Sequence, residues 1–461
     1  MSVSLSGPPT ALAPFPPETL LRILSFVKDD ETFKDIVLSS RQFHVLGKEE
    51  LTRDMDWKKA EDVEPRLAEW RENPRRHRVK ALNLRLFNYD HDFLVQRNIF
   101  ASLDIFSNLS CLTIRNGRIT SHIHTTVTQL QNLRQLRLMW CGIYAFERTN
   151  APPATPFTVT SLVLHEVGSF DRAGQHLESL GPDALRARNL TLMPLALLSG
   201  LRSLTVSSEK SSWRVMQQAY CLLPDTRNLV DLKVTGPPSV EDPGPKPLPV
   251  LVVPLLTTFS GPHYIAASLM RSATQIAKVI LTDDISAQQA LQVIENLHPV
   301  GVRNIELTLE HWDADVLHEI AHRFTQCTRI KLVHRYWGPS DDFLFNFGVH
   351  HLPRTQIDTL LIHARPEDAV RQPPSLHTRF FADGFGHYSA KIRKWEADGA
   401  AGLRHVPPLP SEEDVREYFA VWVRYNPRLE VVSIGNRLWT RDVRGTVWTA
   451  GEEAEVEAEA A

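Results

Sequence analysis

Cysteine is scarce in this chain, which has 461 residues but only four cysteines, Cys111, Cys141, Cys221 and Cys327. They are too few and too widely spaced for a disulfide framework or for a CxxC metal site. We therefore expect reduced thiols inside a packed core, and no metal ion or other cofactor.

The chain also lacks an excess of charge of either sign, because 51 Lys and Arg residues oppose 54 Asp and Glu residues. This balance leaves no basic footprint for nucleic acid. The first residues lack the basic start and the apolar run of a signal peptide. The longest apolar run, Leu248 to Phe259, is too short to span a bilayer and contains two prolines. We expect an intracellular protein, cytoplasmic or nuclear, without a nucleic-acid or membrane partner.

The stretch from Pro14 to Trp57 begins with a proline turn and continues with apolar residues at helical spacing. In Phe15-Pro16-Pro17-Glu18 the prolines favour a first helical turn, and Glu18 lies near the positive end of its dipole. A second helix is predicted over Asp30 to Ser39. Three short helices cannot bury all of this apolar surface among themselves, so part of it is predicted to face a partner or the rest of the chain.

This order of motifs resembles the F-box family, in which Leu-Pro-x-Glu is followed by Ile-Leu, an apolar second helix and a Ser-Arg-x-Phe turn. Here the motifs read Phe15 to Glu18, Ile23-Leu24, Ile36 to Leu38 and Ser40 to Phe43, with Phe15 in place of the commoner Leu. The resemblance implies docking on a Skp-type adaptor and, through it, on a cullin. The adaptor-binding residues that it implies are Phe15, Pro16, Leu20, Leu21, Leu24, Val27, Val37 and Phe43.

From Val79 onward another pattern recurs, apolar-x-x-apolar-x-apolar, and most of its starts lie about 20 to 30 residues apart, as in leucine-rich repeats. The segment Leu133 to Ile143 matches the core L-x-x-L-x-L-x-x-C-x-I of that repeat in full. The frames start at Val79, Leu109, Leu133, Val159, Leu201, Leu229, Leu256, Ile276, Val302, Cys327, Ile357 and Leu429.

These patterns predict an α/β fold in which a three-helix F-box precedes a leucine-rich-repeat-like horseshoe, with parallel strands inside and helices outside. The F-box resemblance covers only about a tenth of the chain, and together with the repeats it resembles F-box proteins of the fungal type with such a solenoid. The predicted order is a disordered N-terminus (1–13), the F-box (14–57), a linker helix (58–78), the solenoid (79–450) and an acidic disordered tail (451–461).

Several segments between the frames carry predictions of their own. Helices are expected over Ser286 to Leu297, over Asp313 to Phe324 and after Ser411, and an extra strand over Arg188 to Met193. Arg365 to Pro410 is predicted to be an insertion. A hairpin on either side of Gly445 is expected to cap the last repeat, because a solenoid needs a covered end.

One motif has the form of a zinc site, since His318-Glu319-Ile320-Ala321-His322 fits H-E-x-x-H. On a helix the two histidines share one face and could bind zinc, with Glu319 as a general base. No third ligand is recognisable downstream. The repeat frame instead points Leu317, Ile320, Ala321 and Phe324 into the core, so we expect the match to be a coincidence and the protein not to be an enzyme.

Recognition is expected on the strand positions that point away from the core, because side chains alternate along a strand. This alternation predicts a mixed, partly basic concave surface. The residues predicted to bind a protein substrate are Arg115, Arg137, His165, Lys233, Glu306, Lys331 and His363, with Met139, Val163 and Val333 beside them.

The favoured hypothesis is a non-catalytic substrate-recognition subunit of a Skp-cullin-F-box ubiquitin ligase. One alternative is a repeat scaffold for protein–protein interaction whose F-box-like helices no longer bind the adaptor. A less favoured alternative is a zinc hydrolase built on the HEIAH helix. The sequence names no substrate.

Overall fold

The computed structural model describes the chain in segments that follow the repeats. These are residues 19, 30–39, 53–86, 93–120, 123, 126–127, 129–147, 158–170, 190–209, 212–236, 251–310, 313–334, 344, 352, 355–364, 412–434, 437–442 and 447–452. The chain divides into two compact units, unit 1 with residues 1–179 and 189–197, and unit 2 with residues 180–188 and 198–461.

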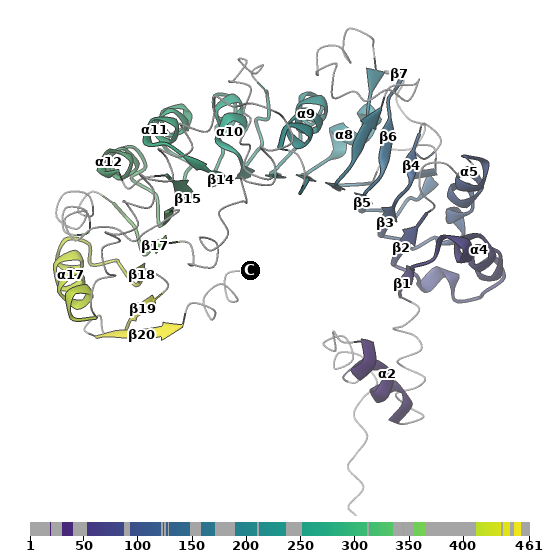
Figure 1. The fold of residues 1–461 in the computed structure, drawn as a ribbon, viewed down its shortest axis with the longest axis horizontal. Coiled ribbons are helices and arrows are strands. Elements are labelled where there is room, and N and C mark those ends of the chain that lie inside the picture. The colour runs from purple at the N-terminus through teal and green to yellow at the C-terminus, as the bar shows by residue number, and fades with distance from the viewer. Residues whose placement is uncertain are drawn as a thin grey trace, which may run out of the picture. The chain divides into compact units, whose positions relative to one another are not determined.

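Unit 1 contains a parallel sheet in which each strand pairs with the strand of the next repeat (Figure 1). Its order is β1 (Asp54–Trp57), β2 (Ala81–Arg85), β3 (Cys111–Arg115), β5 (Gln135–Met139) and β8 (Ser161–His165). The helical segments of this unit include η1 (Ala60–Asp62), α4 (Val63–Arg71), η2 (Arg76–Arg78), α5 (Phe93–Ala101) and η3 (Leu103–Ile105).

A second, shorter parallel sheet in unit 1 follows the turns after the main strands. It consists of β4 (Arg118–Ile119), β6 (Gly142–Tyr144) and β9 (Gly168–Phe170). The predicted extra strand is present as β10 (Leu190–Thr191), which pairs antiparallel with β7 (Phe146–Glu147) rather than joining the main sheet. The three repeats that contain β3, β5 and β8 are thus paired with their neighbours both before and after the turn.

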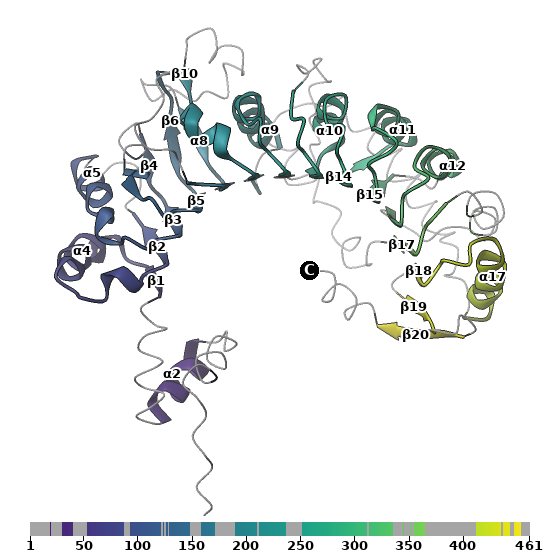
Figure 2. The ribbon, with the colours of Figure 1, turned by 180° about the vertical axis from the view of Figure 1, so that it is seen from behind.

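Unit 2 contains a longer run of parallel strands in chain order. These are β11 (Ser203–Ser207), β12 (Asp231–Thr235), β13 (Thr258–Gly261), β14 (Lys278–Ile285), β15 (Asn304–Leu309), β16 (Arg329–His334), β17 (Thr359–Ala364) and β18 (Val431–Ile434). One helix follows most strands and packs on the same side of the sheet, as Figure 2 also shows in the view from behind.

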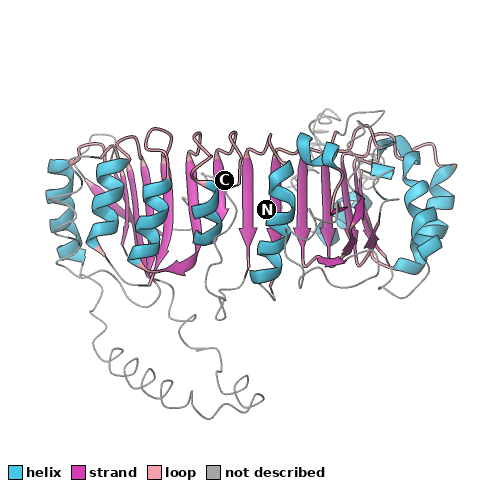
Figure 3. Ribbon diagram, turned by 90° about the horizontal axis from the view of Figure 1, so that it is seen from above, coloured by secondary structure: helices cyan, strands magenta, loops and turns pink. Residues whose placement is uncertain are grey.

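The helices of unit 2 lie side by side, α10 against α11 and α11 against α12 (Figure 3). Their bounds are α9 (Ser212–Leu222), η5 (Leu223–Asp225), α10 (His263–Leu269), α11 (Ala287–Asn296), α12 (Ala314–Arg323) and α17 (Glu412–Tyr425). α8 (Leu195–Gly200) lies where the chain passes from unit 1 to unit 2. The predicted helices over 286–297, over 313–324 and after Ser411 are therefore confirmed.

The repeat frames form the core, since the first apolar residue of every frame is buried, from Val79 to Leu429. In the full consensus match, Leu133, Leu136, Leu138, Cys141 and Ile143 are all buried. Each frame leads into one strand of a main sheet. Burying a Leu or Val side chain contributes about 1.5–3 kcal/mol, so the repeated frame supplies the stabilisation that each repeat lacks alone.

Asparagine residues just before several frames connect successive repeats. The side-chain amides of Asn108, Asn132 and Asn228 donate to the carbonyls of His77, Ser107 and Ser199, at 2.7, 2.8 and 2.7 Å. In these three repeats an Asn directly before the frame thus provides a side-chain hydrogen bond to the preceding repeat.

An antiparallel hairpin ends the sheet of unit 2, as predicted. β19 (Arg437–Arg441) pairs with β18 and with β20 (Trp448–Glu452). Phe419 of α17 packs between the hairpin rings, 5.5 Å from Trp439 and 4.5 Å from Trp448. Because β20 ends at Glu452, the segment predicted as an acidic tail from 451 begins inside this strand.

The predicted F-box stretch is described only in part. α2 (Asp30–Ser39) coincides with the second predicted helix, and the last four residues of the stretch form β1 of the main sheet. Phe15, Pro16, Leu20, Leu21, Leu24, Val27 and Phe43 lie outside the described residues, as does the 365–410 insertion. Within the described part, no helix is long and apolar enough to cross a membrane.

Candidate protein-binding faces

Each main sheet has one face toward the helices and an opposite face that we call the open face. The buried residues of the strands, such as Leu162 and Leu164 of β8, alternate with half-buried ones, such as Val163 and His165. The predicted alternation therefore holds, and the recognition residues proposed from the sequence occupy the open positions.

On the open face of unit 1, the strand register brings basic side chains together. Arg85 lies beside Arg115, Arg115 beside Met139, and Met139 beside His165. Arg137 lies two residues before Met139, is exposed, and donates to the Gln135 side chain at 3.1 Å. No Asp or Glu occupies an open position on β2, β3, β5 or β8, so these four strands give the face a basic part, whereas the neighbouring β1 carries the exposed Asp54 and Asp56.

Trp140 stands at the end of β5, between two of these basic groups. Its ring lies 5.8 Å from the Arg115 guanidinium and 5.1 Å from the His165 ring, which meets it edge-on. The side chain is 41% exposed. Arginine over an indole face is a favourable cation–π arrangement, so the ring and the guanidinium hold each other on the surface.

The backbone at Trp140 has a left-handed conformation with φ of 53°. Asn116 and Glu166 take the same conformation at the equivalent position of the repeats before and after, with φ of 58° and 51°. The N–H of Trp140 donates to the His165 carbonyl at 2.8 Å, and that of Asn116 to the Met139 carbonyl at 3.0 Å. The turns after β3, β5 and β8 all have this geometry, which suits Gly or Asn far better than Trp.

The open face of unit 2 carries charges of both signs. Lys233 is exposed on β12, whereas Lys331 of β16 lies beside Glu306 of β15 in the register, with Nζ 3.4 Å from Oε1. The side chains of this pair are 16% and 28% exposed. The charges of the two central predicted residues thus neutralise each other.

His363 differs from the other predicted recognition residues. It occupies an open position on β17 beside Val333, but it is only 8% exposed, and Leu361 and Ser433 are buried as well. The strands at this end of unit 2 therefore offer little exposed surface, and the structure does not present His363 as an exposed contact.

The HEIAH motif lies on α12, and the residues of this helix that face the core are the predicted ones. Leu317, Ile320, Ala321 and Phe324 are buried, whereas His318 and His322 are exposed and stack with ring centroids 6.2 Å apart. Arg323 donates to the carbonyl of Glu295 at 2.6 Å. Among the described residues, no third metal-binding side chain joins the two histidines, so the arrangement gives a zinc site no support.

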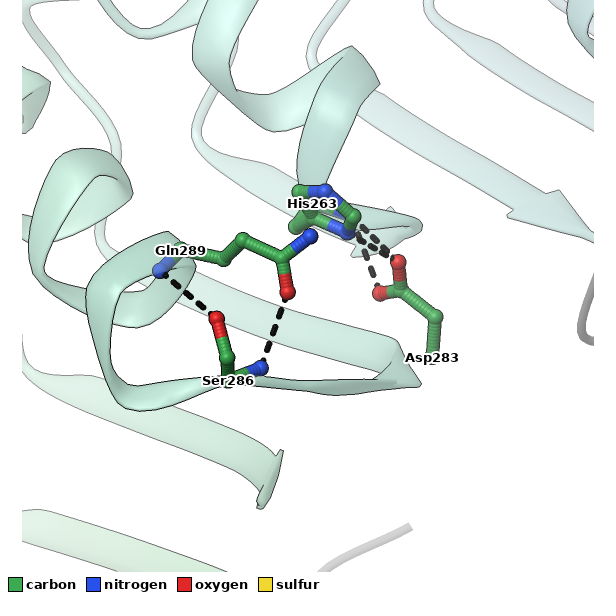
Figure 4. A network of polar contacts seen from close by, with 4 residues as sticks. All are labelled: His263, Asp283, Ser286 and Gln289. Atoms are coloured by element: carbon green, nitrogen blue, oxygen red, sulfur yellow. Dashed lines mark hydrogen bonds and ion pairs between the residues drawn. The ribbon is translucent and has the colours of Figure 1, made fainter. Parts of the chain in front are cut away.

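Polar contacts at the strand-to-helix turns of unit 2 fix the helix ends (Figure 4). The carboxylate of Asp283 on β14 accepts from the backbone N–H of His263 at 2.9 Å and contacts its ring Nδ1. Ser286 and Gln289 form a reciprocal capping box at the start of α11, at 3.3 and 2.8 Å. The sequence signal for this box is Ser286 followed three residues later by Gln289.

Two of the cysteines fill equivalent roles inside the repeats. The Cys141 thiol donates to the Ile114 carbonyl at 3.3 Å, and the Cys327 thiol to the Arg303 carbonyl at 3.5 Å, in each case in the preceding repeat. Burial raises the pKa of the Cys141 thiol to about 12, and that of Cys327 also to about 12. Neither thiol is therefore a nucleophile at neutral pH.

The comparisons with known proteins give only distant likenesses. No family model and no curated protein matches the sequence. Among solved structures, the chain resembles a TLR13–ssRNA13 complex (14% identity, TM-score 0.35, 62% of this chain and 39% of that one). It also resembles the leucine-rich repeat-containing protein LegL7 of Legionella pneumophila (14%, 0.31, 61% and 89%) and an internalin of Listeria monocytogenes (13%, 0.23, 64% and 78%). The chain thus covers well under half of the TLR13 chain.

Proposed function

We propose that this chain is a repeat scaffold for protein–protein interaction that serves as the substrate-recognition subunit of a Skp-cullin-F-box ubiquitin ligase. The observation that supports it is the order of its parts, in which an F-box-like apolar stretch precedes repeats with an open strand face. Rigid strands that present alternating exposed side chains suit the binding of a protein surface.

The adaptor-docking half of the proposal is supported by α2. This helix ends in an apolar stretch, and Leu38 is 74% exposed while Ile36 is half-buried. A large apolar side chain so exposed is a natural contact for a partner protein. The F-box resemblance identifies that partner as a Skp-type adaptor.

Co-purification of the full chain tests this half. We expect an affinity-tagged chain to retain a Skp-type adaptor and a cullin, and Pro16→Ala with Leu24→Ala to lose both. Truncating one buried Leu costs about 2–5 kcal/mol, a large part of the roughly 8 kcal/mol of a micromolar complex. Val300→Ala is the control, because Val300 is also an exposed apolar residue but lies in unit 2. Undiminished adaptor recovery by the double variant would contradict the ligase role and leave the scaffold role.

A further inference from the structure

The open face of unit 1 combines three features that the fold does not require. Arg85 and Arg115 lie side by side on β2 and β3, and Arg137 follows on β5. None of these guanidinium groups forms an ion pair with a carboxylate in the described part of the chain. The Nε atom of Arg115 is buried and has no hydrogen-bond partner there. The positive charge of these arginines is therefore not neutralised by a direct ion pair, and the carboxylates on the neighbouring β1 belong to Asp54 and to Asp56, which accepts from the Asn83 amide.

Trp140 has a backbone strain that the turn alone does not explain, because another residue could make the same turn with less strain. A bulky side chain with φ of 53° is a backbone outlier, and such strain persists mainly where a site uses it. Asn116 makes the same turn one repeat earlier with a residue suited to it. Trp140 nevertheless exposes its ring beside Arg115, whereas the equivalent Glu166 is buried.

We propose that Arg85, Arg115, Arg137 and Trp140 form an anchoring site for an acidic peptide segment of a partner protein, with an apolar side chain of that segment packed on Trp140. The inference rests on the proposed role of the open face in binding protein. Tryptophan and arginine are the residues that most often dominate interface energies.

The geometry sets the form of the segment. Adjacent strands lie about 4.8 Å apart and an extended chain advances about 3.3 Å per residue, so Arg85 and Arg115 match carboxylates one or two residues apart. Each guanidinium offers a planar fork that pairs with a carboxylate through two parallel hydrogen bonds. The apolar residue then follows toward β5, where the ring of Trp140 and the Met139 side chain lie.

The test is selection of a random phage-displayed peptide library on the full-length protein, with counter-selection on Trp140→Gly. Selected peptides are then titrated by fluorescence polarisation. The fold should survive this substitution because glycine adopts the left-handed conformation freely. Asn116→Gly is the matched control, since it makes the same change at the same turn of the neighbouring repeat.

We expect selected peptides to combine Asp or Glu with an apolar residue, and Trp140→Gly or Arg115→Glu to weaken them at least about tenfold. Asn116→Gly should bind as the wild type does, and circular dichroism should confirm that all variants are folded. Failure to enrich any clone, clones without acidic residues, or equal binding to the two glycine variants would overturn the proposal.

Three further arms identify other occupants. A phosphoserine peptide that binds where its glutamate version does not, or a single-stranded oligouridine that binds as tightly as the peptides, would overturn the acidic-peptide assignment. A dimer in sedimentation that Trp140→Gly dissociates would assign the site to a second copy. None of these results depends on adaptor co-purification, so failure of this proposal is distinct from failure of the ligase role.

Discussion

The open faces of the two units differ in how their charges are balanced. In unit 1, Arg85, Arg115 and Arg137 have no acidic partner in the described part of the chain, whereas in unit 2 Lys331 pairs with Glu306. The strands beneath both faces are alike, with the same buried frame. The repeat determines to which face a side chain points. The residues beside it on the neighbouring strands determine whether its charge is already paired or is available for binding.

Charge reversal on the two faces gives the largest expected contrast. Lys331→Glu places two carboxylates side by side and should lower the free energy of unfolding by roughly 1–2 kcal/mol. Arg137→Glu changes an exposed residue and should shift it by less than about 0.5 kcal/mol. Urea unfolding of purified variants measures both. If the open faces bind substrate as proposed, both variants should also lose captured proteins and retain the adaptor.

The control for the unit 2 variant is the exchanged pair, Glu306→Lys with Lys331→Glu, which should regain most of the lost stability. If Arg137→Glu and Lys331→Glu destabilised the protein equally, the two faces would not differ in how their charges are paired. If Arg137→Glu still captured the same proteins, Arg137 would not take part in substrate recognition.

The first helical turns of α11 in unit 2 and α4 in unit 1 also differ, and we expect this difference to have a smaller effect on stability. In unit 2 the Ser286 side chain accepts from the Gln289 N–H, whereas in unit 1 Asp62 precedes α4 without a side-chain cap hydrogen bond. We expect Ser286→Ala to cost about 1 kcal/mol. Asp62→Ala should cost less than about 0.5 kcal/mol, since its exposed contact with Arg66 at 3.7 Å is weak. Thermal unfolding measures both, and a larger loss at Asp62 would contradict the assignment.

We expect the reactivity of the buried thiols to differ least between the two units. Cys141 and Cys327 both have pKa values raised from 9.0 to about 12, so at pH 8 they should react with Ellman's reagent only after unfolding. The folded state binds these protons more tightly, so their contribution to stability is complete below pH 9 and is lost as the pH rises toward 12. Cys141→Ala and Cys327→Ala should each remove one slowly reacting thiol. Fast labelling of either wild-type thiol would show that its repeat opens.

The sequence predicted the repeats well because their signal is repeated burial. Each frame start from Val79 to Leu429 is buried, and the frames place Glu306 and Lys331 at the same distance into their strands. β1 was missed because Asp54 to Trp57 offers only Met55 and Trp57 as inward residues, too short a pattern to recognise. The adaptor-binding assignment stays a prediction, because most of its residues lie outside the described part.

Trp140 could not have been identified from the pattern. In most sequences Gly or Asn indicates a left-handed turn. Among the three equivalent residues, only Asn116 provides that signal. The exposure of Trp140 and the position of its ring beside Arg115 depend on a backbone conformation set by the neighbouring repeat. Strain of this kind is visible only in three dimensions.

The hairpin after β18 has a consequence for how such an array can change in length. A parallel strand edge accepts another strand of the same kind, so a stack of repeats has no inherent size. β19 runs against β18 and occupies that edge, and β20 returns to the direction of the repeat strands, with Phe419 packed against Trp439 and Trp448. A repeat inserted before β18 therefore keeps the parallel pairing of the array, whereas a repeat added behind β20 would pack on a hairpin strand instead of on another repeat.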